Sequence, residues 1–483
     1  MTVIIWKRWR RASTASLLLL ASGSVEWRCS SPARLAPKHL VLVVFDTLRA
    51  DRMSLFGYPK PTTPFLESLA SEALVFENAK APAPWTVPSH SSLLTGLQPA
   101  QHRAQWGRIF LDEKFTTLAE TLRANDFCTT GFSANSLVSR RTGLAQGFDS
   151  FKNVGRKQAS RKKRDRTASI LEAIPKVLDS ALERNCRLFL FVNFMDTHIP
   201  YNTSKYGRQF GVSHGGPVRN AAVKWKISAG LRPFSDRERR LHAAAYDAAV
   251  RSSDDAARQV VSLLRDRGML ESTVLAFTSD HGEGLGDHQE LGHVLSVWEE
   301  QLAVPLVIRL PKGYRSPQRI TATTSLTAFA PSVLDWLEVD RPHVLSDSPT
   351  LDTVSDQPVT ADYRSYFSES ARKTNLKMAG RHPALVERVA HRHVVYCDAF
   401  KLIVTARKEV SFFNLEDDPL EASDLADTTG DRSTRLQDCL ETYRSLLDAG
   451  TFTRFDDAVT AREQTKSALA VDAKLLRSLG YVN

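Results

Sequence analysis

Acidic and histidine side chains follow three apolar segments of the chain, at the points where those segments end. They are Asp46 after 40–45, Asp196 and His198 after 188–192, and Asp280 and His281 after 273–277. Carboxylate oxygens and imidazole nitrogens together suit zinc or manganese, whereas calcium and magnesium prefer oxygen ligands alone. Asp46, Asp280 and His281 therefore predict a site for one divalent metal, with zinc or manganese favoured and calcium or magnesium as alternatives.

The segment 83–98 places a hydroxyl at the start of a predicted helix. Pro88 suits the first turn of a helix that runs through Leu94, and Gly96 lies near its end. We expect Thr86 just before this helix, where free N–H groups and the helix dipole favour an anionic ligand. A hydroxyl at this position can also serve as a helix cap, so the segment alone leaves both roles open.

The elements that position these residues have the pattern of an α/β fold. Continuous apolar runs, typical of strands buried on both faces, cover 40–45, 188–192, 273–277 and 304–308. Helical patterns cover 64–73, 118–125, 170–184, 237–267 and 326–337. In such folds ligands bind beyond the carboxyl ends of the strands. We therefore expect a large mixed β-sheet sandwiched by helices, with the acids and histidines at one edge.

The composition of the sequence changes after residue 340. The stretch 341–385 is polar and contains Pro342, Pro349 and Pro358, so we interpret it as a linker or irregular segment. Short strand patterns and one helical pattern follow, near 393–396, 401–405, 410–415 and 435–448. The predicted organisation is a catalytic domain over 37–340, the linker, and a small C-terminal α+β subdomain over 386–483.

The first 36 residues have the order of a secretory signal. Four basic residues within 7–11 precede a short apolar stretch and then small residues. This order predicts export, for example to the periplasm; a cytoplasmic location follows if the segment is not a signal. Nothing later in the sequence reaches eighteen apolar residues in a row, so we expect no transmembrane domain.

The net charge of +10 comes from two local clusters rather than from a basic face. The clusters lie at 7–11 and 156–166, and the remainder of the chain is neutral. This distribution argues against a nucleic-acid partner. The second cluster fits a solvated loop, or a contact for an anionic polymer or membrane surface.

The five cysteines are scattered, odd in number and without a C-x-x-C pair. This pattern predicts neither a disulfide framework nor a zinc knuckle. Cys128 and Cys186 lie in or beside apolar runs, and we interpret them as small core residues.

An ordered series of segments resembles the sulfatase branch of the alkaline-phosphatase superfamily over roughly residues 38–483. The segments are LVLVVFDTLRADRMSLFGY, WTVPSHSSLLTG, MDTHIPY, FTSDHGEGLGDH, EEQLAVPLVIRLP, FFNLEDDPLEASDLA and LLRSLGYVN. The resemblance implies a metal bound by Asp46, Asp280 and His281. It also places Thr86 at the nucleophile position, in contact with the metal. His198 and His293 stand where the family binds the ester oxygens or protonates the leaving group.

Two departures from the sulfatase pattern bear on the chemistry. Sulfatases carry Cys or Ser at the position of Thr86 and Arg at that of His90, because a maturation enzyme recognises these residues and makes formylglycine. They also carry paired acids where this chain has Asp46 and Thr47. The chain is in these respects more similar to phosphoethanolamine transferases and lipoteichoic-acid synthases, which use an unmodified threonine.

The resulting hypothesis is a formylglycine-independent, metal-dependent hydrolase or transferase of phosphoric or sulfuric esters. Its partner is an anionic ester, with a glycan or lipid headgroup as candidate carriers. Two alternatives stay open at this point: a true sulfatase, and a catalytically silent protein of sulfatase fold that binds anionic glycans or lipids.

Several polar residues near these motifs receive secondary roles. We expect Asn135 to line the pocket, because it follows the predicted strand 128–133. Glu283, Asp287 and His288 are interpreted as groups that surround the metal ligands or face solvent.

Overall fold

The computed structural model describes ten stretches of the chain. They are residues 37–105, 108–155, 165–213, 216–218, 221–228, 232–293, 296–353, 358–364, 390–427 and 430–452. The predicted signal segment, most of the basic cluster 156–166 and the terminal LLRSLGYVN lie outside them, so export stays a prediction. Within the described residues no helix has the length and apolar character needed to cross a membrane.

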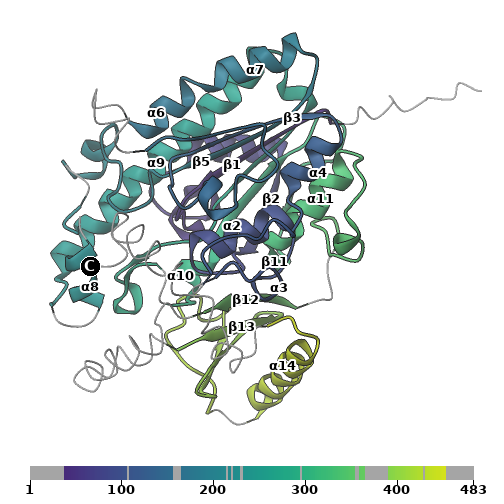
Figure 1. The fold of residues 1–483 in the computed structure, drawn as a ribbon. Helices are drawn as coiled ribbons and strands as arrows, with labels where there is room; N and C mark the ends of the chain where they lie inside the picture. The colour runs from purple at the N-terminus through teal and green to yellow at the C-terminus, as the bar shows by residue number, and fades with distance from the viewer. Residues whose placement is uncertain are drawn as a thin grey trace, which may run out of the picture. The chain divides into compact units, whose positions relative to one another are not determined.

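A sheet of nine strands forms the centre of the fold (Figure 1). Eight strands follow the order β10-β2-β9-β6-β1-β5-β3-β4, and β11 pairs with β2. Their bounds are β1 His39–Phe45, β2 Leu74–Lys80, β3 Phe127–Ser133, β4 Ser150–Asn153, β5 Arg187–Phe194, β6 Thr273–Thr278, β9 Ala303–Arg309, β10 Gln318–Ile320 and β11 Thr324–Ser325. Strand β1 runs parallel to both neighbours, β5 and β6, and β9 is antiparallel, so the sheet is mixed as predicted.

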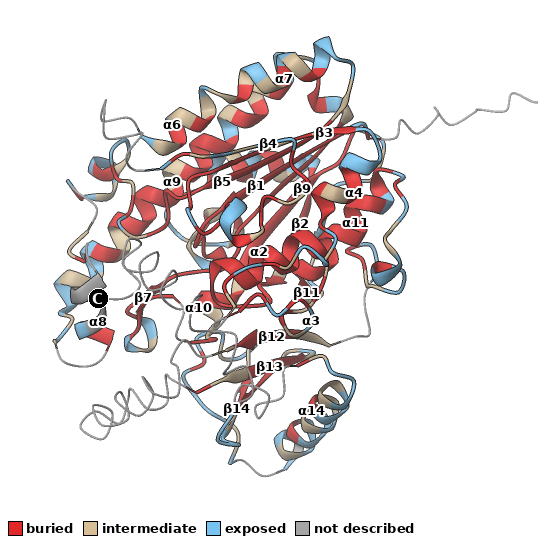
Figure 2. Ribbon diagram, in the orientation of Figure 1, coloured by how far each residue is buried: buried red, intermediate tan, exposed pale blue. Residues whose placement is uncertain are grey.

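Helices cover both faces of the sheet, which explains why β1 is apolar at every position. Leu40, Leu42 and Val44 pack on one face, and Val41 and Val43 on the other; all five are fully buried (Figure 2). The first face is covered by α2 Thr86–Thr95, α4 Leu118–Ala124 and α11 Phe329–Trp336. The second is covered by α1 Pro64–Leu69, α6 Arg166–Leu171, α7 Ile174–Glu183 and α9 Asp236–Arg265.

Short elements complete this part of the chain. They are helices α3 Pro99–His102, α8 Ala221–Ser228 and α10 Glu299–Leu302, and the antiparallel pair β7 Gly284–Leu285 and β8 Leu291–Gly292. The β7–β8 hairpin follows the metal-ligand motif directly, and it ends one residue before His293.

A second, antiparallel sheet forms the C-terminal part. It contains β12 Val359–Tyr363, β13 Arg392–Cys397, β14 Phe400–Thr405 and β15 Val410–Asn414, and α14 Asp431–Asp448 packs against it. β12 lies within the stretch 341–385, which therefore contributes a strand as well as irregular chain. Buried Lys401 links this sheet to the rest: its Nζ lies 2.7 Å from Val297 O and 3.0 Å from Glu299 Oε1.

The cysteine interpretation is wrong, because four of the five cysteines form disulfides. Cys128 pairs with Cys186, and Cys397 pairs with Cys439. The partners are 58 and 42 residues apart and are brought together by strand pairing and by helix packing. Sequence spacing cannot reveal such long-range pairs.

Candidate metal centre and active site

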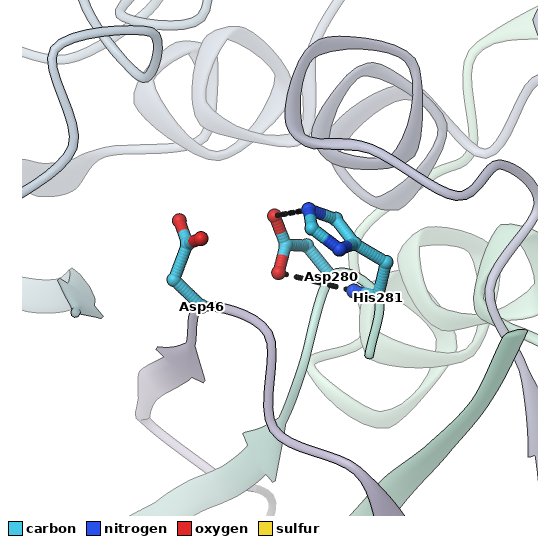
Figure 3. A group of neighbouring side chains, drawn as sticks. All are labelled: Asp46, Asp280 and His281. Carbon is cyan, nitrogen blue, oxygen red and sulfur yellow. Dashed lines mark hydrogen bonds and ion pairs between the residues drawn. The ribbon is translucent and has the colours of Figure 1, made fainter. Parts of the chain in front are cut away.

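The candidate metal centre lies at the carboxyl ends of two neighbouring strands. Asp46 is the first residue after β1, and Asp280 and His281 follow β6 after Ser279. Because β1 and β6 are parallel and adjacent, their ends meet at one edge of the sheet. The three side chains are fully buried, and one possible ligand atom from each lies within 4.8 Å of the others (Figure 3).

The donor atoms of this triad fit a bound cation. Asn135 Nδ2 donates to Asp46 Oδ2 at 2.7 Å, whereas Oδ1 of the same carboxylate is buried with no hydrogen-bond partner among the described residues. Asp280 Oδ1 accepts from the His281 backbone N–H at 3.0 Å, and its Oδ2 likewise lacks a hydrogen bond there. His281 Nδ1 donates to Gly282 O at 2.9 Å, so Nε2 is the nitrogen that faces the carboxylates and could bind a cation once its proton is lost. Each of the three side chains thus presents one atom that could bind a cation, and two of these atoms, Asp280 Oδ2 and His281 Nε2, lie 3.3 Å apart.

The charges of the triad are unbalanced without a cation. Burial and the neighbouring Asp280 charge raise the pKa of Asp46 to about 7. Burial disfavours the charged forms of Asp280 and His281 as well, but their mutual attraction outweighs it: the pKa of Asp280 is lowered well below its ordinary value and that of His281 is raised to about 9. A divalent cation would replace the protons held by this cluster.

Thr86 stands beside the triad as the first residue of α2. Its Oγ1 lies 3.5 Å from His281 Nε2 and 3.4 Å from Asn135 Nδ2. Trp85, not Thr86, occupies the N-cap position, so the capping role considered above does not apply. Gly96, at φ +71°, ends the helix as expected.

Asn135 connects the nucleophile position with the metal ligands. Its Oδ1 accepts from Leu137 N at 2.9 Å, and this bond turns Nδ2 towards Asp46 and Thr86. The expectation that Asn135 lines the pocket therefore agrees with its position. An amide N–H so placed can stabilise negative charge that develops on the threonine oxygen.

His90 lies one turn after Thr86, at the position where sulfatases carry arginine. Its Nδ1 donates to Thr86 O at 3.0 Å and lies 3.3 Å from Asp280 Oδ2, and the ring is fully buried. His90 thereby joins the first turn of α2 to a metal ligand.

His198 and His293 reach the centre from two further segments. The ring centroids of His198 and His293 are 5.1 Å apart, and those of His293 and His281 are 4.5 Å apart. Burial lowers the pKa of His198 to about 3 and also lowers that of His293. Both imidazoles are therefore neutral near pH 7 in the free protein, and a bound anion would favour their protonated forms.

The loops that carry these residues are locked together by hydrogen bonds. Thr47 Oγ1 donates to Thr197 O at 2.8 Å, and Thr197 Oγ1 donates to Asp46 O at 2.7 Å. Ser279 Oγ donates to Phe45 O at 2.6 Å, and Ser89 Oγ donates to Asp280 O at 2.5 Å. The ends of β1, β5 and β6 and the start of α2 thus form one rigid unit, which favours a preorganised site.

Other predicted residues lie outside the metal triad. Asp196 accepts from Asn202 Nδ2 at 2.6 Å, so it orders its own loop. Asp287 bonds Arg49 at 2.6 Å, and His288 Nδ1 lies 3.0 Å from Glu300 Oε1. Glu283 is fully buried, with Oε1 at 3.3 Å from His293 Nδ1.

Comparison with known proteins identifies the family. The sulfatase family model matches residues 38–339. The chain belongs to the sulfatase family. As a member of the sulfatase branch of the alkaline-phosphatase superfamily, it is similar to arylsulfatase K of Xenopus laevis, with 22% identity over 457 residues, 85% of this chain and 83% of that protein. It is also similar to the multifunctional alkaline phosphatase superfamily protein PehA of Trinickia caryophylli, with 23% identity over 477 residues, 80% of this chain and 91% of the other.

A solved structure shares the sulfatase fold of this chain. The phosphonate monoester hydrolase of Agrobacterium radiobacter superposes with a TM-score of 0.68 at 20% identity, and the match covers 86% of this chain and 96% of that one. Both sheets described above belong to the matched architecture, so the α/β fold prediction is confirmed.

Two groups near the site had no signal in the sequence. Tyr246, in the middle of α9, donates to Thr47 O at 2.6 Å and accepts from Arg49 N at 2.8 Å. Lys224, in α8, lies close to Gly292 and His293. Both residues come from helices whose approach to the strand ends depends on the tertiary fold, which local patterns do not encode.

Proposed function

We propose that this sulfatase-family protein hydrolyses phosphoric or sulfuric esters with metal assistance, using the unmodified hydroxyl of Thr86 as nucleophile. The observation that carries the proposal is the position of Thr86 Oγ1, 3.5 Å from the available nitrogen of His281 and at the first residue of a helix. Formylglycine cannot form from threonine, so the hydroxyl itself has to react.

The ligands we propose for the metal are Asp46, Asp280, His281 and Thr86, with zinc or manganese favoured. When bound, the cation would supply a Lewis acid beside the hydroxyl and the ester oxygens. Asn135 Nδ2 donates towards the threonine oxygen, and the N-terminus of α2 favours the negative charge of the ester group.

The proposed reaction has two steps. Thr86 Oγ–H gives its proton to solvent water, and the oxygen attacks phosphorus or sulfur in line with the leaving alcohol. The bond from phosphorus or sulfur to that alcohol breaks as the new ester bond to Thr86 forms. The leaving oxygen takes a proton from His198 or His293, whose proton affinity rises when the anionic ester is bound. Water then cleaves the threonine ester; transfer of the group to an alcohol acceptor is the transferase variant of this step.

The function is tested with purified protein and a panel of aryl phosphate, phosphodiester and sulfate esters, before and after chelation and metal replacement. We expect turnover that chelator abolishes and that zinc or manganese restores. Turnover without metal would contradict the proposal. Tight metal binding without turnover of any ester would favour a silent binding protein. Measuring the bound metal in the same samples identifies the cofactor.

A further inference from the structure

Helix α8 is attached to the hairpin that leads into His293. Ser228 Oγ accepts from Leu291 N at 3.0 Å, and Val218, Ile227 and Leu291 form a small buried apolar cluster. These contacts fix α8 beside β8. Side chains on the adjoining part of α8 are therefore held close to the residues that follow the hairpin.

Lys224 extends from α8 over Gly292, directly before His293. A Cβ atom at Gly292 would lie 2.3 Å from Lys224 Nζ and 2.8 Å from its Cε, so any larger residue here would have to displace the lysine side chain. Gly292 also has φ +84°, a conformation that favours glycine. The glycine thus makes room for the ammonium group against the backbone of the active-site hairpin.

The surroundings of Lys224 belong to the active site. Its charge is close enough to be attracted by Glu283 and to lower the pKa of His198, of His293 and of His242 in α9. Burial lowers the pKa of Lys224, and attraction by Glu283 opposes this shift.

The buried carboxylates of the site carry more negative charge than one divalent cation can balance. Asp46, Asp280 and Glu283 are fully buried carboxylates, so a divalent cation balances only part of their charge. An anionic ester adds further negative charge close to His293. A lysine ammonium beside the two histidines can offset that added charge by direct binding.

We propose that Lys224 is a specificity-determining residue, which binds the non-bridging oxygen that carries the second negative charge of a phosphate monoester, beside His198 and His293. This inference rests on the proposed function and specifies its substrate class. A phosphate monoester is largely dianionic above pH 7, because its second pKa is about 6. Sulfate monoesters and phosphodiesters carry one charge, so they gain less from the lysine.

The test compares Lys224→Met with wild type on an aryl phosphate, an aryl sulfate and a phosphodiester at pH 8. We expect kcat/KM for the dianionic aryl phosphate to fall roughly ten- to hundredfold, the usual effect of losing a charge-assisted hydrogen bond, and for the two monoanions to fall less than about threefold. Lys224→Arg should restore part of the loss. Lys226→Met, an exposed position on the same helix, is the matched control and should match wild type.

An equal loss for all three esters would overturn the proposal, because it would mean that Lys224 only supports the structure around Glu283. If Lys224→Met folds poorly, Lys224→Gln supplies the second variant, since it removes the charge but keeps a polar side chain and should lower kcat/KM for the dianion selectively.

Failure of the proposed function can be told apart from failure of this inference. If wild type hydrolyses none of the three esters, calorimetry with inorganic phosphate decides. Weaker phosphate binding in Lys224→Met than in Lys226→Met supports the inference, and equal binding contradicts it.

Discussion

Thr86 is the residue on which the proposed chemistry depends most directly. Thr86→Ala should lower kcat at least about a thousandfold, because the attacking oxygen is removed while Asp46, Asp280 and His281 stay in place. Thr86→Ser should keep part of the activity. Kinetics and metal content of the purified variants measure both effects. Thr95→Ala, which removes a buried hydroxyl at the other end of α2, is the control. Full activity of Thr86→Ala would refute the nucleophile assignment.

Asn135 should affect both metal binding and catalysis, because its amide contacts Asp46 and Thr86. Removing its amide in Asn135→Ala should weaken metal affinity or activity by about 10- to 100-fold, the usual effect of losing a group that orients a metal ligand. Metal titration calorimetry and kcat/KM are the measurements. Asn125→Ala, which loses an exposed amide that donates to Thr121 O at the end of α4, serves as the control. Unchanged metal affinity and unchanged kcat/KM in Asn135→Ala would show that the hydrogen bond from Asn135 to Asp46 is not needed for function.

Metal affinity should depend on pH because protons compete for the same atoms. The pKa of Asp46 is raised to about 7 in the metal-free centre, so below that value a proton must leave before a metal can bind. The pKa of His281 is raised to about 9, so its proton must leave as well. We expect the apparent Kd to rise about tenfold for each pH unit from 9 down to 7, and about a hundredfold for each unit below 7, where Asp46 is also protonated. Metal titrations at pH 6, 7 and 8 measure this, and a Kd independent of pH would count against Asp46 as a ligand.

At the residue scale, the candidate site residues could be predicted from the sequence, but most of the contacts between them could not. Asp46, Asp280 and His281 could be found because ligands follow strand ends in α/β sheets. Thr86 could be found because proline and glycine mark the limits of its helix. The contacts of His90 and the approach of Lys224 could not, since they depend on how α2 and α8 pack.

At the scale of elements, His288 connects the β7–β8 hairpin to α10. Burial lowers its pKa, but the bond to Glu300 outweighs this and raises the pKa to about 8, above the unfolded value of about 6.5. The resulting stabilisation is complete below pH 6.5 and is lost as pH rises through 8.

His288→Gln should therefore destabilise the protein at pH 6 and much less at pH 9. We expect the pH-dependent part to be about 1 kcal/mol, after allowance for solvent screening. Urea unfolding of both proteins at several pH values measures the difference. A difference that grows with pH would show that the His288–Glu300 pair is not stabilising. His343→Gln is the control, because His343 is exposed and begins a separate 3₁₀ helix, His343–Leu345.

The long apolar strands were predicted to within about one or two residues, because burial on both faces leaves an unmistakable run of β-branched and aromatic side chains. The predicted helix 170–184 is instead two helices, α6 and α7, with Pro175 in the first turn of the second. The β7–β8 hairpin was not predicted, since strands of two residues leave no periodic signal.

At the scale of the whole molecule, the two disulfides fasten adjacent strands and the C-terminal helix. Replacing both members of the Cys397–Cys439 pair by alanine should lower the free energy of unfolding by about 2–4 kcal/mol. Guanidinium unfolding measures the loss, with Cys29→Ala as the control, and peptide mapping checks the pairing. No loss of stability would mean that the pair is not formed in solution. Disulfides persist in oxidising compartments, which supports the prediction of export.

The proposed mechanism requires a covalent ester at an unmodified Thr86. Its most direct test is peptide mass spectrometry of the metal-loaded protein, quenched with acid during turnover of an aryl phosphate. The predicted result is a peptide containing Thr86 with an ordinary threonine mass before substrate is added, and a fraction carrying one phosphoryl group on Thr86 afterwards. Two results would contradict the mechanism. One is that residue 86 already carries a chemical modification before substrate is added. The other is that no adduct forms on the peptide and Thr86→Ala turns over the ester as fast as wild type.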